Sequence, residues 1–158
     1  MPVLELWHGT NEDFGLFDTS SSLGVHFGTS QAAAERLAST GRTEYSDGDA
    51  AVPRQFAVSI ANAIGLHDLG IWSFQAVLRQ LQDLRIANAV QVDGAYEAWN
   101  LSDAHGWKAL KDLLHEAGYD GVRYINQIED AGSESWIAFE ASQIEPMQAP
   151  RLRLVNLG

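Results

Sequence analysis

Two short apolar segments near the start of the chain each carry a histidine next to a glycine, and this pattern constrains the fold most. The first segment, residues 3–8, alternates loosely between apolar and polar side chains and is followed by Gly9 and Thr10. The second, residues 25–27, lies between glycines and has His26 at its centre. Segments of this kind predict strands. Two such strands can place polar side chains and bare backbone on one wall of a cleft.

The rest of the chain predicts further strands and helices. Period-2 alternation predicts strands over residues 54–60, 122–126 and 135–139, and apolar residues at helical spacing predict helices over residues 69–87 and 102–117. A short Ala-rich helix over residues 31–38 follows a cap at Thr29 or Ser30, residues 88–101 fit neither pattern, and residues 151–155 offer one more strand. The expected fold class is α+β, with antiparallel strands at both ends of the chain and helices between them.

Composition limits the classes of function. The 158 residues, 46% hydrophobic and 20% charged, predict one soluble globular domain over residues 1–158. No apolar run approaches the ~20 residues of a membrane span, and the N-terminus does not resemble a signal peptide. The absence of cysteine excludes thiolate chemistry and favours a reducing cytoplasm. Because the net charge of −11 repels phosphate backbones, we expect no nucleic-acid partner, and because no apolar run is long enough to span a membrane, we expect no membrane partner.

An acidic loop lies between the last two strongly predicted strands. It carries Glu129 and Asp130, and Glu134 follows just before the second of these strands. Carboxylates beside a cleft can stabilise positive charge that develops in a transition state. In a chain with 21 acidic residues, each of them can equally be a solvated loop residue.

Other catalytic patterns are missing from the sequence. The five histidines show no metal-ligand spacing, so no metal site is expected. The glycines do not form a phosphate-binding loop, and no Gly-x-Ser-x-Gly segment is present.

Taken in order, these blocks resemble the ADP-ribosyltransferase superfamily, in the clade of diphtheria toxin and poly(ADP-ribose) polymerase. Residues 6–10 (LWHGT) are similar to the first-strand motif, and residues 24–28 (GVHFG) to the second-strand motif. Residues 118–139 resemble the ends of small phage and bacterial members. The resemblance implies an ADP-ribosyltransferase-like split antiparallel β-core: two small facing sheets, a cleft between them, and the two long helices on the flanks.

The resemblance also implies an activity, that of an NAD-dependent mono-ADP-ribosyltransferase. Its substrates would be NAD and an acceptor protein in the cytoplasm of a bacterial host cell, since some small members act as anti-CRISPR proteins or host-modifying effectors. Breaking the nicotinamide–ribose bond develops oxocarbenium-like charge on the ribose. Such an enzyme must hold the nicotinamide, fix the ribose and place a negative charge nearby.

The first two motifs imply contacts to NAD. His8 would hydrogen-bond a ribose hydroxyl on the adenosine side, Gly9 would meet the nicotinamide carboxamide through its backbone, and Thr10 would add a hydroxyl contact. His26 occupies the place where the family usually has a tyrosine that stacks on nicotinamide. Either His26 or another aromatic residue such as Phe27 would supply that face.

The catalytic carboxylate has three candidates. An overlay on the family places Glu134 or Ser135 at the position of its glutamate, whereas small phage-type members have an acid on the preceding loop, which would be Glu129 or Asp130. We expect Glu129 or Asp130, and after them Glu134, to hydrogen-bond the 2′-hydroxyl of the nicotinamide ribose, stabilise the cation and orient the acceptor.

Two other functions remain open from the sequence. A chain of this fold without catalysis would be an acidic binding or inhibitor protein, which the missing tyrosine and the displaced glutamate favour and the retained residues 8–10 oppose. An NAD glycohydrolase would share the site and transfer ADP-ribose to water.

Overall fold

The computed structural model describes residues 3–9, 19–39 and 52–147, and shows an α+β fold with four α-helices and two mostly antiparallel sheets in that part of the chain. Thr10 and the strand expected at residues 151–155 lie outside the described residues. The elements in chain order are β1 (Val3–His8), β2 (Val25–Phe27), α1 (Ser30–Ser39), β3 (Arg54–Ser59), β4 (Ala63–Gly65), α2 (Phe74–Asp83), α3 (Ala89–Leu101), α4 (Asp103–Glu116), β5 (Gly121–Ile125), β6 (Glu134–Ala138), a 3₁₀ turn (Ala141–Gln143) and β7 (Ile144–Pro146).

The strands form one three-stranded and one four-stranded sheet, in the orders β1-β3-β7 and β2-β6-β5-β4. Every pairing is antiparallel except that of β4 with β5, which is parallel. No sequence pattern assigned a strand to residues 63–65, because β4 has only three residues and is too short to show an alternating pattern. A pair of backbone hydrogen bonds between Trp7 and Gly28, both 2.9 Å long, joins the end of β1 to the end of β2 and so connects the two sheets.

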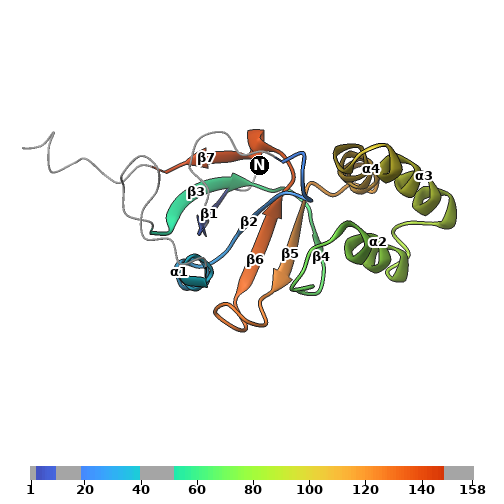
Figure 1. The fold of residues 1–158 in the computed structure, drawn as a ribbon. Helices are drawn as coiled ribbons and strands as arrows, with labels where there is room; N and C mark the ends of the chain where they lie inside the picture. Colours follow the sequence, from blue (N-terminus) through green and yellow to red (C-terminus); the bar gives the residue numbers. More distant parts are fainter. Residues whose placement is uncertain (1–2, 10–18, 40–51, 148–158) are drawn as a thin grey trace, which may run out of the picture.

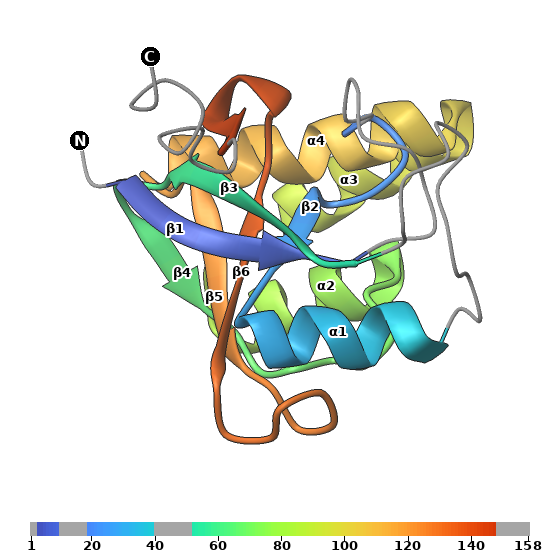
Figure 2. The same cartoon turned by 90° about the vertical axis from the view of Figure 1, so that its left-hand side faces the viewer.

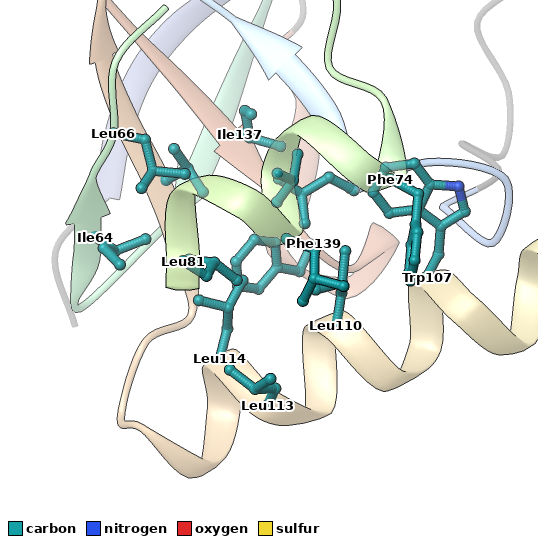
Figure 3. Packing of buried hydrophobic residues seen from close by; sticks show 14 of the residues in the cluster. Ile64, Leu66, Phe74, Leu81, Trp107, Leu110, Leu113, Leu114, Ile137 and Phe139 are labelled. Carbon is teal, nitrogen blue, oxygen red and sulfur yellow. The ribbon is translucent and has the colours of Figure 1, made fainter. Parts of the chain in front are cut away.

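The four-stranded sheet lies between the three-stranded sheet and helices α2, α3 and α4 (Figures 1 and 2). On the helical side, α2 and α4 contribute about half of a large buried cluster that also includes Ile137 and Phe139 (Figure 3). On the other side, a second cluster fills the space between the sheets with side chains such as Phe27, Phe56 and Val58. The two facing sheets are thus packed against each other rather than separated by an open cleft.

The helix expected over residues 69–87 is shorter at both ends. Gly70 has a φ of +66°, and Ser73 then begins α2 by accepting a hydrogen bond from the backbone N–H of Ala76 at 3.1 Å. Arg85 has a φ of +62° just after the last turn, which stops the helix. Outside these limits, Leu69, Trp72, Ile86 and Ala87 pack on the core, whereas Ile71 and Leu84 are 80% and 46% exposed. The apolar spacing at residues 71 and 84 therefore does not mark a buried helical face.

Residues 89–101, which no sequence pattern assigned, form α3. Its start has a capping box, in which Asn88 and Gln91 each accept a hydrogen bond from the other's backbone N–H at 2.9 Å. Ala95 is the one buried residue of this helix, whereas Val90 and Leu101 are 80% and 76% exposed. Apolar side chains therefore lie on both the inner and outer faces of α3. For this reason, the apolar residues in its sequence do not recur at helical spacing.

Ser102 begins α4, as the sequence predicts. Its Oγ accepts a hydrogen bond from the backbone N–H of His105 at 3.1 Å. Replacing it (Ser102→Ala) is expected to lower the free energy of unfolding by about 1 kcal/mol, because one backbone donor of the first turn loses its partner. Urea titration checks this, with Ser102→Asp as the matched variant that retains a cap. Equal destabilisation by both substitutions would contradict the role of the cap.

Candidate functional site

The ends of β1 and β2 meet helix α1 and the loop between β5 and β6, and a small cavity lies where they converge. Its volume is about 20 Å³, which is room for about one water molecule. Segments from both ends of the chain contribute its walls, and the lining residues are Trp7, Gly9, His26, Phe27, Gly28, Ala32, Ala33, Arg36, Tyr124, Asn126, Glu129 and Ser135.

His8 is not among the residues that line this cavity. Its Nδ1 donates a hydrogen bond to the backbone carbonyl of His26 at 2.6 Å, and its ring lies 5.3 Å from the ring of Phe27. This bond assigns the proton to Nδ1 and makes Nε2 the acceptor of the ring. Burial lowers the pKa of His8 to about 4, and the positive charge of Arg36 contributes in the same direction. His8 is therefore neutral at pH 7.

His26 belongs to an aromatic cluster with Tyr124 and Trp72. Its Nδ1 is 2.9 Å from the hydroxyl of Tyr124, and its ring centre lies 5.5 Å from that of Trp72. Burial lowers the pKa of His26 to about 3, aided by the positive charge of Arg36. Burial also raises the pKa of Tyr124 to about 12. The imidazole and the phenol are therefore both uncharged over the physiological range.

Gly9 and Gly28 are required by close packing around the cavity. A Cβ on Gly9 would lie 2.0 Å from the carbonyl oxygen of Ala33, and one on Gly28 would lie 2.7 Å from Oγ of Ser135. Helix α1 therefore approaches the end of β1 so closely that any side chain at position 9 would displace it. This contact accounts for the glycine in the His-Gly-Thr segment without any ligand.

The loop from Asn126 to Ser133 is held in a tight turn. The backbone N–H of Asn126 donates to Ser133 O at 2.8 Å, and that of Gly132 donates to Asn126 O at 2.9 Å. The buried side chain of Asn126 hydrogen-bonds Oγ of Ser135, with its amide nitrogen 2.7 Å away. Asp130 has a φ of +41°, which allows the chain to reverse direction within the loop. The loop is thereby held beside the cavity.

The structure separates the three candidate carboxylates. Glu129 lines the cavity. Asp130 is fixed to α1, because its carboxylate accepts a hydrogen bond from the Thr29 hydroxyl at 2.5 Å and its backbone N–H donates to Glu35 at 2.5 Å. Glu134 is exposed and pairs with Arg123 at 3.1 Å. Because successive side chains of a strand point to opposite faces, Glu134 points away from the face on which Ser135 lines the cavity.

Four of the predicted site residues thus surround one cavity: Gly9, His26, Phe27 and Glu129. His8 and Asp130 lie next to this cavity, and Glu134 lies elsewhere. Sequence reasoning missed three polar lining residues, Arg36, Tyr124 and Asn126, and named Ser135 only as an overlay position of the family's glutamate. Two signals were present. Residues 124 and 126 share one face of a strand that leads directly into the acidic loop, and residue 36 follows the buried Ala32 and Ala33 at helical spacing.

Within residues 3–9, 19–39 and 52–147, no three side chains of His, Cys, Asp or Glu are grouped so that they could bind a metal ion. None of the helices there combines the length and the apolar character that crossing a membrane requires.

No protein-family model matches the chain, and no curated protein matches it in sequence. A solved structure described as the crystal structure of an anti-CRISPR protein is similar at 13% sequence identity and a TM-score of 0.39, over 92% of this chain and 96% of that chain. At this level of likeness, neither the fold nor the activity of that protein is transferred to this chain.

Proposed function

We propose that this chain is an NAD-dependent mono-ADP-ribosyltransferase with a protein acceptor, built on an ADP-ribosyltransferase-like core, and that Glu129 is its catalytic carboxylate. The observation that carries the proposal is that Glu129 lines the same cavity as Gly9, His26 and Phe27. These residues come from opposite ends of the chain, and the resemblance in sequence assigns all of them to one NAD site.

The first strand would bind the adenosine-side ribose. Because Nδ1 of His8 donates to the backbone of His26, Nε2 is the acceptor of a neutral ring. A ribose hydroxyl is a suitable donor for it. The tautomer is set by the backbone contact and the neutral state by burial, so no proton has to move when the ribose binds.

The nicotinamide side of the site would lie between the aromatic residues and Glu129. As the bond between nicotinamide and C1′ of the ribose breaks, its electron pair leaves with nicotinamide, which departs as a neutral molecule. Glu129 would hydrogen-bond the 2′-hydroxyl and oppose the positive charge that develops on the ribose. A nucleophilic side chain of the acceptor then bonds to C1′ and loses its proton to solvent or to a carboxylate.

The cavity has to open before NAD can enter, because a nicotinamide ring is much larger than one water molecule. The hydrogen bonds from Thr29 to Asp130 and from Asp130 to Glu35 hold the loop against α1. NAD binding therefore requires that α1 and this loop separate. The small volume of the cavity also favours the second candidate function, an acidic binding protein of the same fold that does not turn over NAD.

The decisive experiment combines NAD binding by calorimetry with nicotinamide release in the presence and absence of bacterial lysate. We expect binding, release, and transfer of labelled ADP-ribose to a lysate protein. Release without labelling of protein would assign an NAD glycohydrolase. Neither binding nor release would exclude the enzyme and leave the binding protein.

Truncation of the first-strand histidine tests the same site without turnover. His8→Ala is expected to weaken NAD binding at least tenfold, about 1.4 kcal/mol, because the ribose loses its acceptor. The exposed His105 provides the matched control, and His105→Ala should leave affinity unchanged. Circular dichroism reports whether the fold is retained. Unchanged affinity in His8→Ala would remove this residue from the site.

A further inference from the structure

Arg36 is the one cation among the residues that line the cavity. It lies on α1, one turn after Ala32 and close to Ala33, and these two alanines are buried against the sheets. The spacing places the start of the Arg36 side chain on the edge of the buried face, from where it reaches the cavity while the residue as a whole stays exposed. The guanidinium is thus at the boundary between the cavity and solvent.

The guanidinium of Arg36 has no hydrogen-bond or ion-pair partner in the part of the chain that the structure describes. This is unusual in a chain with a net charge of −11, in which carboxylates are abundant. The nearby acids are engaged with neutral donors instead: Glu35 accepts from the backbone of Asp130 and from the Gln31 amide, and Asp130 accepts from Thr29. The site keeps a cation unpaired although acids lie beside it.

The surroundings of Arg36 leave a definite charge pattern. The two histidines and Tyr124 are uncharged at neutral pH, so they neither repel an anion nor compete for the guanidinium. Glu129 lines the same cavity and is the one carboxylate in its lining. A ligand that fits must therefore present an anionic group to Arg36 and a group of positive or developing positive charge to Glu129.

We propose that Arg36 is the anion subsite of this cavity and binds the pyrophosphate of a dinucleotide. Guanidinium binds phosphate oxygens through two parallel hydrogen bonds, and an exposed cation at the mouth of a cavity also attracts the ligand from solution. The inference rests on the proposed function, because NAD carries both groups that the cavity requires: the anionic pyrophosphate for Arg36 and the positively charged nicotinamide side for Glu129. It also adds a requirement, since ligands without phosphate would miss this contact.

The test compares three probes on the full chain: NAD, nicotinamide riboside, which has no phosphate, and inorganic pyrophosphate. Arg36→Gln is expected to weaken binding of NAD and pyrophosphate at least tenfold and to leave nicotinamide riboside within about twofold. Arg36→Lys keeps the charge but not the fork geometry of the guanidinium, so its affinity for NAD and pyrophosphate should lie between those of the unmodified chain and Arg36→Gln. Arg79 is an exposed arginine on α2 outside the cavity lining, and Arg79→Gln should bind all three probes as the unmodified chain does.

The outcomes separate this inference from the proposed function. If Arg36→Gln weakened the binding of NAD and of nicotinamide riboside by the same factor, the anion subsite would be overturned, even if NAD is still consumed. The same holds if pyrophosphate did not bind, or bound equally well to Arg36→Gln and to the unmodified chain. Conversely, pyrophosphate that binds through Arg36 in a chain that neither binds nor consumes NAD would retain the subsite and refute the transferase.

Discussion

Replacing Glu129 with glutamine is expected to lower the rate of nicotinamide release at least tenfold, equivalent to about 1.4 kcal/mol of barrier, while NAD still binds. Glutamine keeps the size of the side chain and its ability to accept a hydrogen bond, but it removes the charge that opposes the oxocarbenium-like ribose. The effect should therefore fall on kcat rather than on KM. Initial rates at saturating NAD, with affinity measured separately, provide the test.

The neighbouring acids provide matched controls for this substitution. Asp130→Asn removes a charge one residue away, but the amide oxygen can still accept the hydrogen bond from Thr29. Glu134→Gln removes a charge from the exposed pair with Arg123. Both variants should retain most of the activity. If Asp130→Asn abolished nicotinamide release and Glu129→Gln did not, the assignment of the catalytic carboxylate would be wrong.

The elements that build the site were predictable because each has a local signal. β2 has three residues between two glycines, with an apolar residue on each side of its central histidine. α1 begins where the Thr29 hydroxyl accepts a hydrogen bond from the backbone N–H of Ala32 at 3.0 Å. β4 and α3 lacked such signals, since β4 has only three residues and α3 exposes apolar side chains on its outer face. Their positions depend on contacts with distant parts of the chain.

The composition of the site was predictable only in part, because which carboxylate faces the cavity depends on tertiary contacts. Residues 129 and 130 are equivalent in sequence terms, yet the bond from Thr29 and the bond to Glu35 fix Asp130 on α1 and leave Glu129 in the lining. Similarly, the glycine at position 9 suggests a ligand contact in the sequence, whereas the structure shows that Ala33 already requires it.

The histidines of the site predict a marked loss of stability in mild acid. Folding lowers the pKa of His8 from 6.5 to about 4 and that of His26 from 6.5 to about 3, in both cases mainly through burial. The unfolded chain therefore binds protons that the folded chain does not. Their contribution to the free energy of unfolding is complete above pH 6.5, and is lost progressively as the pH falls from 6.5 towards 4 and 3.

Between pH 7 and pH 5 each of these histidines should cost roughly 2 kcal/mol of stability, or roughly 4 kcal/mol together. Urea unfolding as a function of pH measures this loss. His26→Gln, which can still hydrogen-bond the Tyr124 hydroxyl, should reduce the loss by about half. His105→Gln, at an exposed histidine outside the cavity lining, provides the matched control variant. Parallel pH curves for the unmodified chain and His26→Gln would contradict the neutral buried state of His26, and with it the uncharged surroundings that Arg36 and Glu129 require.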